Sequence, residues 1–297
     1  MGVPRVSIRS SRTIIHYIIP ILSILILALM ICAPALCQEP LLLGIHPYLS
    51  CSQLKKRFAP LATYLSKEIG QPVVVRVGSS YQEHIAAIGR DQIDIAYIGP
   101  AEYVLMRKRY GPKPLIVCQE TDGSTTFRGI IIVRDDNPAS SLSDLDKGEF
   151  AFVDPHSTMG YLLPRIMLQH ENPLILAKHR YQFLKTHKNV ALGVLTGDFE
   201  AGAIKEAVYQ KFKTRGLKIL AATPVIAEHL FVTNTTLAET SVNQLRLAML
   251  KLKNTPKGVK VLKSIKPSLS GFSPVSDDAY NSLRQLLDHQ EKKDGAR

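Results

Sequence analysis

The sequence predicts an α/β protein with two lobes. Short apolar runs of strand length alternate along the chain with stretches whose apolar residues recur at helical spacing. This order is typical of a mostly parallel sheet with helices on its faces. Short connections near residues 128–135 and 224–233, without a Ser/Gly-rich linker, favour two lobes between which the chain crosses. We therefore expect residues 38–130 and 231–297 in the first lobe and residues 131–230 in the second.

The first lobe is expected to begin with the strand Leu41–Ile45 and the helix Ser52–Ile69. In that helix the apolar residues fall on one face and the lysines elsewhere, the pattern of a helix packed on a core. A β-branched run then predicts the strand Pro72–Val77. The elements expected next are a helix at 81–90, a strand at 93–98, a helix at 101–109, and strands at 114–118 and 129–133.

The second lobe is expected to open with a capped turn at Ser141–Leu145. A strand at Phe150–Val153 and a helix at Gly160–Gln169 should follow. Further along we expect helices at 189–195 and 202–209 and strands at 217–222 and 231–236, the last of these returning to the first lobe. The C-terminal part is expected to form helices at 241–253, 256–264 and 277–290.

The charge of the chain divides between a leader and the body. The chain has 297 residues, 45% of them hydrophobic, which excludes a disordered chain, and a formal net charge of +12. Three arginines precede an uncharged run at residues 14–31, and the small residues Ala33-Pro34-Ala35 follow it. This pattern predicts a cleaved secretory signal over residues 1–37, with an uncleaved membrane anchor through 14–31 as the alternative. Its removal leaves 34 basic against 25 acidic residues, scattered over helix faces, so no nucleic-acid partner is expected.

Two cysteines, Cys51 and Cys118, remain in the body of the protein. In an oxidising compartment they either form a disulfide or stay free thiols, and their spacing does not decide between the two. No Cys-x-x-Cys motif or Cys/His cluster has metal-ligand spacing, so we expect neither a metal nor a cofactor.

The most informative segment runs from Phe150 to Tyr161. A buried strand leads into Asp154-Pro155, then into Ser157 and Thr158, and then into a helix. The first amides of a helix have no intrahelical partners and carry the positive end of its dipole, so hydroxyls beside them make a site for an anion such as phosphate. The alternative is an ordinary Ser/Thr N-cap that holds no ligand.

This segment also carries a resemblance. The string Phe-Val-Asp-Pro-x-Ser-Thr-x-Gly-Tyr at residues 152–161, followed by Pro164-Arg165, resembles the phosphonate/phosphite-binding proteins of ABC transporters. Matching segments occur in the same order along the chain, at residues 58–65, 94–103 and 197–203. The resemblance implies a type II periplasmic binding fold, whose two lobes close on a small oxyanion.

Site residues follow from the resemblance, position by position. Ser157, Thr158 and the amide of Gly160 would hold ligand oxygens at the helix start, and Tyr48 and Tyr97 would donate hydroxyls from the first lobe. Hydrogen bonds to an ionised acceptor are short and strong, so a few such donors suffice.

Three further positions complete the expected site. His187 would close the second lobe on the ligand. Met159 stands where the family commonly has a third hydroxyl residue, and Glu200 stands where it has an aspartate that is expected to meet an amino group on the ligand. These departures favour an oxyanion other than the usual aminoalkylphosphonate, or a phosphonate with an apolar substituent.

The expected function is binding without catalysis. The protein would capture phosphonate, phosphite or a related small oxyanion in the periplasm and deliver it to an inner-membrane ABC permease. The alternative is a sensory binding protein that presents its ligand to a membrane histidine kinase or chemoreceptor, tethered through residues 14–31 if that segment is retained. An exported enzyme acting on a phosphate ester would need a nucleophile–base pair or a metal cluster, and the sequence offers neither.

Overall fold

The computed structural model describes residues 2, 39–145, 148–171 and 180–295. It divides into two units, Met1–Glu39 and Pro40–Arg297, and the second contains every element discussed below. The predicted signal lies, apart from Gly2, outside the described residues. Among the residues that are described, no helix is long and apolar enough to span a membrane.

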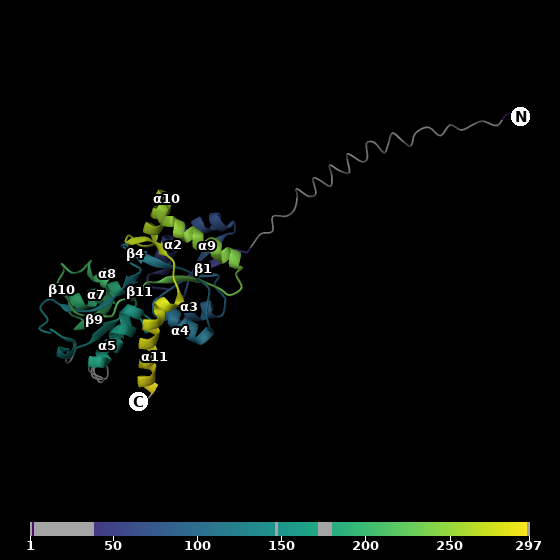
Figure 1. The fold of residues 1–297 in the computed structure, drawn as a ribbon. Coiled ribbons are helices and arrows are strands. Elements are labelled where there is room, and N and C mark those ends of the chain that lie inside the picture. The colour runs from purple at the N-terminus through teal and green to yellow at the C-terminus, as the bar shows by residue number, and fades with distance from the viewer. Residues whose placement is uncertain (1, 3–38, 146–147, 172–179, 296–297) are drawn as a thin grey trace. The chain divides into compact units, whose positions relative to one another are not determined.

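The first lobe is built on a six-stranded sheet with the strand order β13-β4-β12-β3-β1-β2. Figure 1 labels two of these strands, β1 and β4. Its strands are β1 (Leu41–Ile45), β2 (Val73–Val77), β3 (Ile95–Ile98), β4 (Leu115–Thr121), β12 (Leu230–Thr233) and β13 (Leu269–Ser273). One face is covered by α2 (Cys51–Ile69), α9 (Glu239–Lys251) and α10 (Pro256–Ile265). The other face is covered by α3 (Tyr81–Gly89), α4 (Pro100–Tyr110) and α11 (Asn281–Gly295). The two faces have separate apolar cores, because a sheet buried on both sides needs a helical layer on each.

The second lobe contains a five-stranded sheet with the order β10-β6-β9-β7-β8. Its strands are β6 (Gly129–Arg134), β7 (Phe150–Phe152), β8 (Tyr181–Phe183), β9 (Ala201–Lys205) and β10 (Leu217–Ala222). The helices α7 (His187–Thr196) and α8 (Glu206–Tyr209) pack on one face. The short turn Leu142–Asp144, where a capped turn was predicted, and α5 (Leu163–Glu171) pack on the other.

The strands that carry the chain between the lobes run against their neighbours. β12 is antiparallel to both β3 and β4, and β6 is antiparallel to both β9 and β10. The expectation of mostly parallel sheets is therefore wrong for the crossing strands, although β1, β2 and β3 pair in parallel, as do β7, β8 and β9. A strand that enters directly from the other lobe has no crossover helix to turn it round, so it need not run parallel to its neighbours.

The two crossings also pair with each other. β5 (Thr126–Phe127) and β11 (Ile226–Ala227) form a short antiparallel ribbon between the sheets, with Ile226 opposite Phe127. Two adjacent strands make the connection narrow, which is the geometry of a hinge. The predicted lobe boundaries at residues 130 and 230 stay predictions.

One predicted helix is wrong. Residues 202–209 form the strand β9 followed by the single turn α8. The Ala-Gly-Ala run is helix-compatible by propensity, but here its small side chains let α7 pack directly on the strand. A β-carbon on Gly202 would come within 2.6 Å of Val190. Burial under a helix has overridden local preference.

The structure also contains strands that the sequence pattern did not reveal, namely β5, β8, β11 and β13. Three of them have only two or three residues, too few for an alternating pattern to be read. Cys51 is exposed at the start of α2 and Cys118 is buried in β4, and both are free thiols.

Candidate functional site

A cleft lies where the two lobes meet at the hinge. Its free space is about 10 Å³, roughly what the centre of one water molecule requires. The cleft is therefore nearly closed around polar side chains. The residues that line it come from both lobes and from the hinge: His46, Tyr81, Gly99, Glu102, Phe127, His156, Ser157, Thr158, Met159, His187, Lys205 and His229.

The second-lobe wall begins at the predicted helix start. A wide π-helical turn, Thr158–Leu162, leads into α5, and Ser157 caps it by accepting a hydrogen bond from the Gly160 amide at 3.1 Å. The hydroxyl of Thr158 accepts from the amide of Ala101, in the first turn of α4, at 3.1 Å. Both side chains are buried. Each hydroxyl accepts a backbone hydrogen bond and keeps its own proton available for donation.

Met159 and Gly160 pack this wall tightly. Met159 is fully buried, and its sulfur accepts a hydrogen bond from the hydroxyl of Thr223 at 3.5 Å. A β-carbon at Gly160 would lie 2.4 Å from Val153 and 2.8 Å from the Ser157 hydroxyl. Glycine is thus required where the turn passes close to the strand that precedes it.

The first-lobe wall is built around an ion pair between His46 and Glu102. His46 follows β1, and its Nδ1 lies 2.9 Å from Oε2 of Glu102. The same oxygen accepts the Gly99 amide at 2.7 Å, so the proton of the pair sits on Nδ1 of His46. Burial alone would raise the pKa of Glu102, but the charge and hydrogen bond of His46 outweigh it and lower that pKa.

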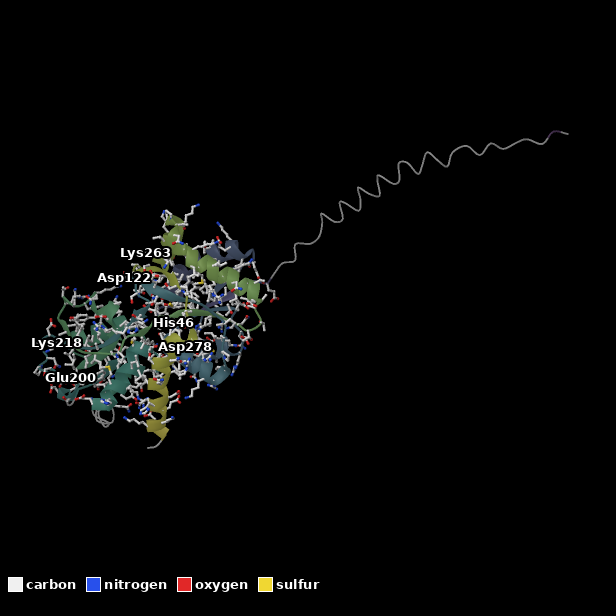
Figure 2. The ribbon with its side chains drawn as sticks, viewed as in Figure 1. His46, Asp122, Glu200, Lys218, Lys263 and Asp278 are labelled. Atoms are coloured by element: carbon white, nitrogen blue, oxygen red, sulfur yellow. The ribbon has the colours of Figure 1, made fainter. Side chains whose placement is uncertain are left out.

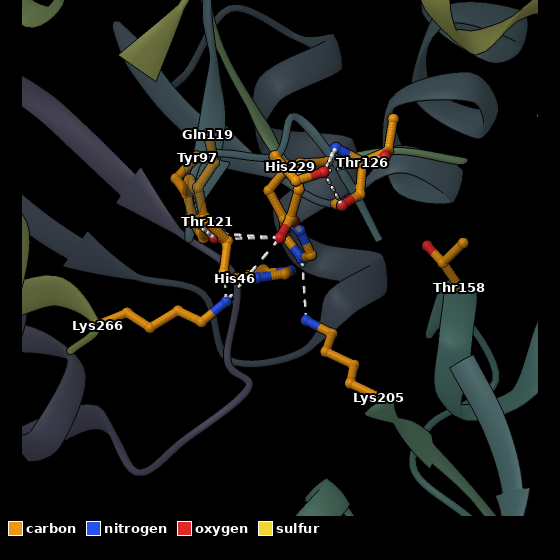
Figure 3. A network of polar contacts seen from close by, with 12 residues as sticks. His46, Tyr97, Gln119, Thr121, Thr126, Thr158, Lys205, His229 and Lys266 are labelled. Atoms are coloured by element: carbon orange, nitrogen blue, oxygen red, sulfur yellow. Dashed lines mark hydrogen bonds and ion pairs between the residues drawn. The ribbon is translucent and has the colours of Figure 1, made fainter. Parts of the chain in front are cut away.

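A second network crosses from the second lobe to the hinge (Figure 3). The ammonium of Lys205, at the end of β9, lies 3.2 Å from Nε2 of His229, and Nδ1 of His229 lies 2.9 Å from Oε2 of Glu228. Glu228 also accepts the hydroxyl of Thr121 at 2.9 Å and faces Lys266 at 3.9 Å. The ion pairs and hydrogen bonds connect all of these groups.

Protonation in this network follows from its burial. Burial lowers the pKa of His229 to about 3 and that of Lys205 to about 8. At neutral pH the imidazole of His229 is therefore neutral, donating to Glu228 and accepting from the Lys205 ammonium. Among the described residues that line the cleft, Lys205 is the one lysine or arginine.

His187 reaches the cleft from the first turn of α7. Its Nδ1 accepts the backbone amide of Lys205 at 3.2 Å. Burial lowers its pKa well below the ordinary value, so the ring is neutral at pH 7 and its proton resides on Nε2. His187 therefore lines the cleft as a neutral hydrogen-bond donor.

The two predicted tyrosines lie behind the cleft wall. The hydroxyl of Tyr97 donates to Gln119 at 2.7 Å, and its ring stacks on His229 at 5.4 Å. Tyr48 is half-buried with its ring 5.0 Å from that of His46, and burial raises its pKa to about 12. Histidines take the positions nearest the cleft, and the tyrosines support them.

Glu200 lies away from the cleft, contrary to the position expected from the resemblance. It precedes β9, whereas Lys205 ends that strand at the cleft, about 16 Å along an extended chain. Its carboxylate accepts the Gly148 amide at 2.8 Å. Figure 2 shows Glu200 far from His46. Glu200 is not among the residues that line the cleft.

Sequence reasoning missed several lining residues. His46 and Glu102 had a usable signal, since they follow the carboxyl ends of the parallel strands β1 and β3, where α/β folds place ligands. Lys205 was missed because its strand was predicted as a helix. Within the described part of the chain, no group of three or more His, Cys, Asp or Glu side chains is arranged to hold a metal ion.

Comparisons with known proteins point to one family. The sequence profile described as "ABC transporter, phosphonate, periplasmic substrate-binding protein" matches residues 43–280. The phosphate-import protein PhnD of Mycolicibacterium smegmatis is 25% identical over 275 residues, which cover 84% of this chain and 85% of that protein.

Solved structures agree on the fold. PhnD1 of Prochlorococcus marinus, in complex with methylphosphonate, superposes with a TM-score of 0.75 at 19% identity, covering 86% of this chain and 99% of that one. A binding-protein component of an ABC phosphonate transporter from Pseudomonas aeruginosa gives 0.74 at 22% identity, covering 86% and 88%. The fold is that of a type II periplasmic binding protein, and the chain belongs to the family of periplasmic substrate-binding proteins of phosphonate ABC transporters.

Proposed function

We propose that the cleft binds a small phosphonate, phosphite or phosphate-like oxyanion, which the protein delivers to its ABC permease. The observation that carries the proposal is the convergence of donors in one buried space. The ammonium of Lys205 and the hydroxyls of Ser157 and Thr158 line it, together with the rings of His46 and His187. Charge-assisted hydrogen bonds of this kind are strong and suit an ionised oxygen ligand.

Lobe closure is the expected binding mechanism. Donors come from both lobes, so an oxyanion held between them stabilises the closed arrangement relative to the open one. The cleft is lined by residues of both lobes, so we expect a ligand to enter and leave as the ribbon of β5 and β11 flexes. No bond is made or broken, as expected for a transport component.

The relatives narrow the ligand class and favour import. One is a phosphate importer and another was crystallised with methylphosphonate. Both ligands are small tetrahedral oxyanions, and the buried sulfur of Met159 suits an apolar substituent better than a polar one. These relatives are transport proteins, which favours import over the sensory alternative. A cleaved signal at residues 1–37 accounts for periplasmic delivery, and anchoring through residues 14–31 stays a prediction.

Titration calorimetry with methylphosphonate, phosphite and phosphate tests the proposal. We expect at least one of them to bind with micromolar affinity or better. Joint replacement of Ser157 and Thr158 by alanine should weaken binding by about 10- to 100-fold, because two hydrogen bonds to an ion are lost. Joint replacement of the surface residues Ser141 and Ser143 by alanine is the matched control. Failure of all three ligands to bind the wild-type protein would contradict the proposal.

A further inference from the structure

Two buried polar atoms in the cleft wall lack a partner. Across the described residues, few buried side-chain atoms lack a hydrogen bond, and two of them are Nε2 of His46 and Oε1 of Glu102. They belong to the same ion pair, and both residues line the cleft. Unpaired buried polar atoms are rare because they lose their hydration without compensation. Two such atoms on one pair of cleft residues indicate that the bound ligand supplies their hydrogen-bond partners.

The chemistry of the two atoms differs. Oε2 of Glu102 already accepts from His46 and from the Gly99 amide, so Oε1 is left as a pure acceptor on a carboxylate. Nδ1 of His46 holds the proton shared with the carboxylate. Its Nε2 is the ring nitrogen left without a partner. The pair therefore places an unpaired imidazole nitrogen and an unpaired carboxylate acceptor in the same cleft wall.

An oxyanion satisfies such a pair only if it carries a proton. Oε1 of Glu102 repels a bare anionic oxygen, whereas a P–OH group donates a hydrogen bond to it. Resting on the proposed function, we propose that Glu102 selects oxyanions that keep a proton near neutral pH. Phosphonates, phosphite and phosphate belong to this class, and sulfonates and sulfate are fully ionised.

In the part of the cleft lining that the structure describes, the groups packed around His46 and Glu102 offer no second carboxylate that could accept the proton of the ligand. The ring of Tyr81 packs 5.2 Å from that of His46, and burial raises the pKa of Tyr81, which keeps its hydroxyl a neutral donor. The ring of His84 lies 6.3 Å from that of His46 and bonds to the carbonyl of Tyr97 instead. The lining residues of the second lobe contribute hydroxyls, imidazoles and an ammonium, so Glu102 is the one carboxylate among the described residues lining the cleft.

The experiment compares matched ligands in one protein. Methylphosphonate and methanesulfonate share shape and methyl group, and near pH 7 only the first retains an acidic proton. We expect the wild-type protein to bind methylphosphonate at least about tenfold more tightly, and phosphate more tightly than sulfate, by calorimetry. Glu102→Gln puts an amide donor where Oε1 stood and keeps a carbonyl oxygen for His46 and Gly99. The preference should therefore fall by about tenfold or more, with sulfonate binding improved.

Glu228→Gln is the control. It removes an equally buried negative charge next to the Lys205–His229 contact, but both Glu228 oxygens are already bonded within the protein. It should change the affinities for methylphosphonate and methanesulfonate by the same factor and leave the ratio of the two affinities unchanged. Equal binding of methylphosphonate and methanesulfonate by the wild-type protein overturns the inference alone, even if Glu102→Gln does not fold. The inference is also overturned if Glu102→Gln leaves the ratio of the two affinities unchanged. If the wild-type protein binds no oxyanion at all, the proposed function is overturned as well.

Discussion

The two walls of the cleft are built on different principles. The second-lobe wall is a helix start with consecutive donors, Ser157 and Thr158, reinforced by the ammonium of Lys205. The first-lobe wall is the buried pair of His46 and Glu102, which leaves a carboxylate acceptor, Oε1 of Glu102, without a partner. Under the proposals above, the first kind of wall would attract any oxyanion, and the second would discriminate among them. Affinity and selectivity would then depend on different lobes.

The largest expected effect comes from removing the positive charge of the second-lobe wall. Lys205→Met should weaken phosphonate or phosphate binding by about 100-fold or more, because a desolvated ion contact is lost and the anion is left without a countercharge. Calorimetry measures this directly. Lys218→Met, in the same sheet but away from the cleft (Figure 2), is the control and should bind as the wild type does. If Lys205→Met binds as tightly as the wild type, the residues of the first lobe must provide most of the binding free energy instead.

The pH dependence of binding provides a second test of the role of Lys205. Burial lowers the pKa of Lys205 to about 8 from an ordinary value of 10.5. The ammonium is therefore present below pH 8 and is lost as the pH rises through that value. Loss of the ammonium should weaken binding by up to about tenfold per pH unit above 8, in addition to the weakening that follows from deprotonation of the ligand. Lys205→Arg keeps its charge throughout, so its affinity, measured by calorimetry from pH 7 to 9.5, should decline less steeply. Parallel pH profiles for the two proteins would contradict this role of Lys205.

The backbone of the second-lobe wall is expected to tolerate little change. Gly160→Ala should lower the free energy of unfolding by about 1–3 kcal/mol, because its β-carbon would overlap Val153 and the Ser157 hydroxyl. It should also weaken ligand binding, since Ser157 must move. Gly295→Ala, at the end of α11, is the control, because its new β-carbon would meet nothing within 4 Å. Thermal and denaturant unfolding measure the effect, and equal stability of the two variants would refute the packing argument.

The smallest effect concerns how the walls are held together. α11 bridges the lobes, because Asp294 pairs with Arg165 of α5 at 2.7 Å and Asp288 pairs with Lys108 of α4 at 2.7 Å. Arg165→Ala removes one partly exposed pair and should weaken ligand binding by about two- to threefold by favouring open lobes.

Small-angle scattering of the unliganded protein should show a slightly larger radius of gyration for Arg165→Ala. Arg134→Ala breaks an exposed ion pair with Asp136 in the second lobe and should leave both measurements unchanged. An equal change in the two variants would mean that the bridge does not affect closure.

Much of the fold could be read from the sequence. The helices α2, α4, α9 and α10 fall where periodicity predicted them, within two residues at each end. The exceptions include β9 and the hinge ribbon, and each has its own cause. Ala201–Lys205 becomes a strand since α7 covers its small residues, and a two-residue strand has no pattern of its own.

The sequence by itself determined the helix start at Ser157 to Gly160, since its donors are neighbours in the chain and their chemistry is local. Only the tertiary structure decided the opposite wall. His46, Glu102, Lys205 and His229 come from four distant segments that meet where parallel strands end and the crossings pass. Glu200 lies away from the cleft because it precedes β9, and the length of that strand separates it from Lys205 at the cleft. Whether a buried side chain is charged depends on which groups pack around it. Those groups come from several segments, so no single segment of the sequence predicts the charge.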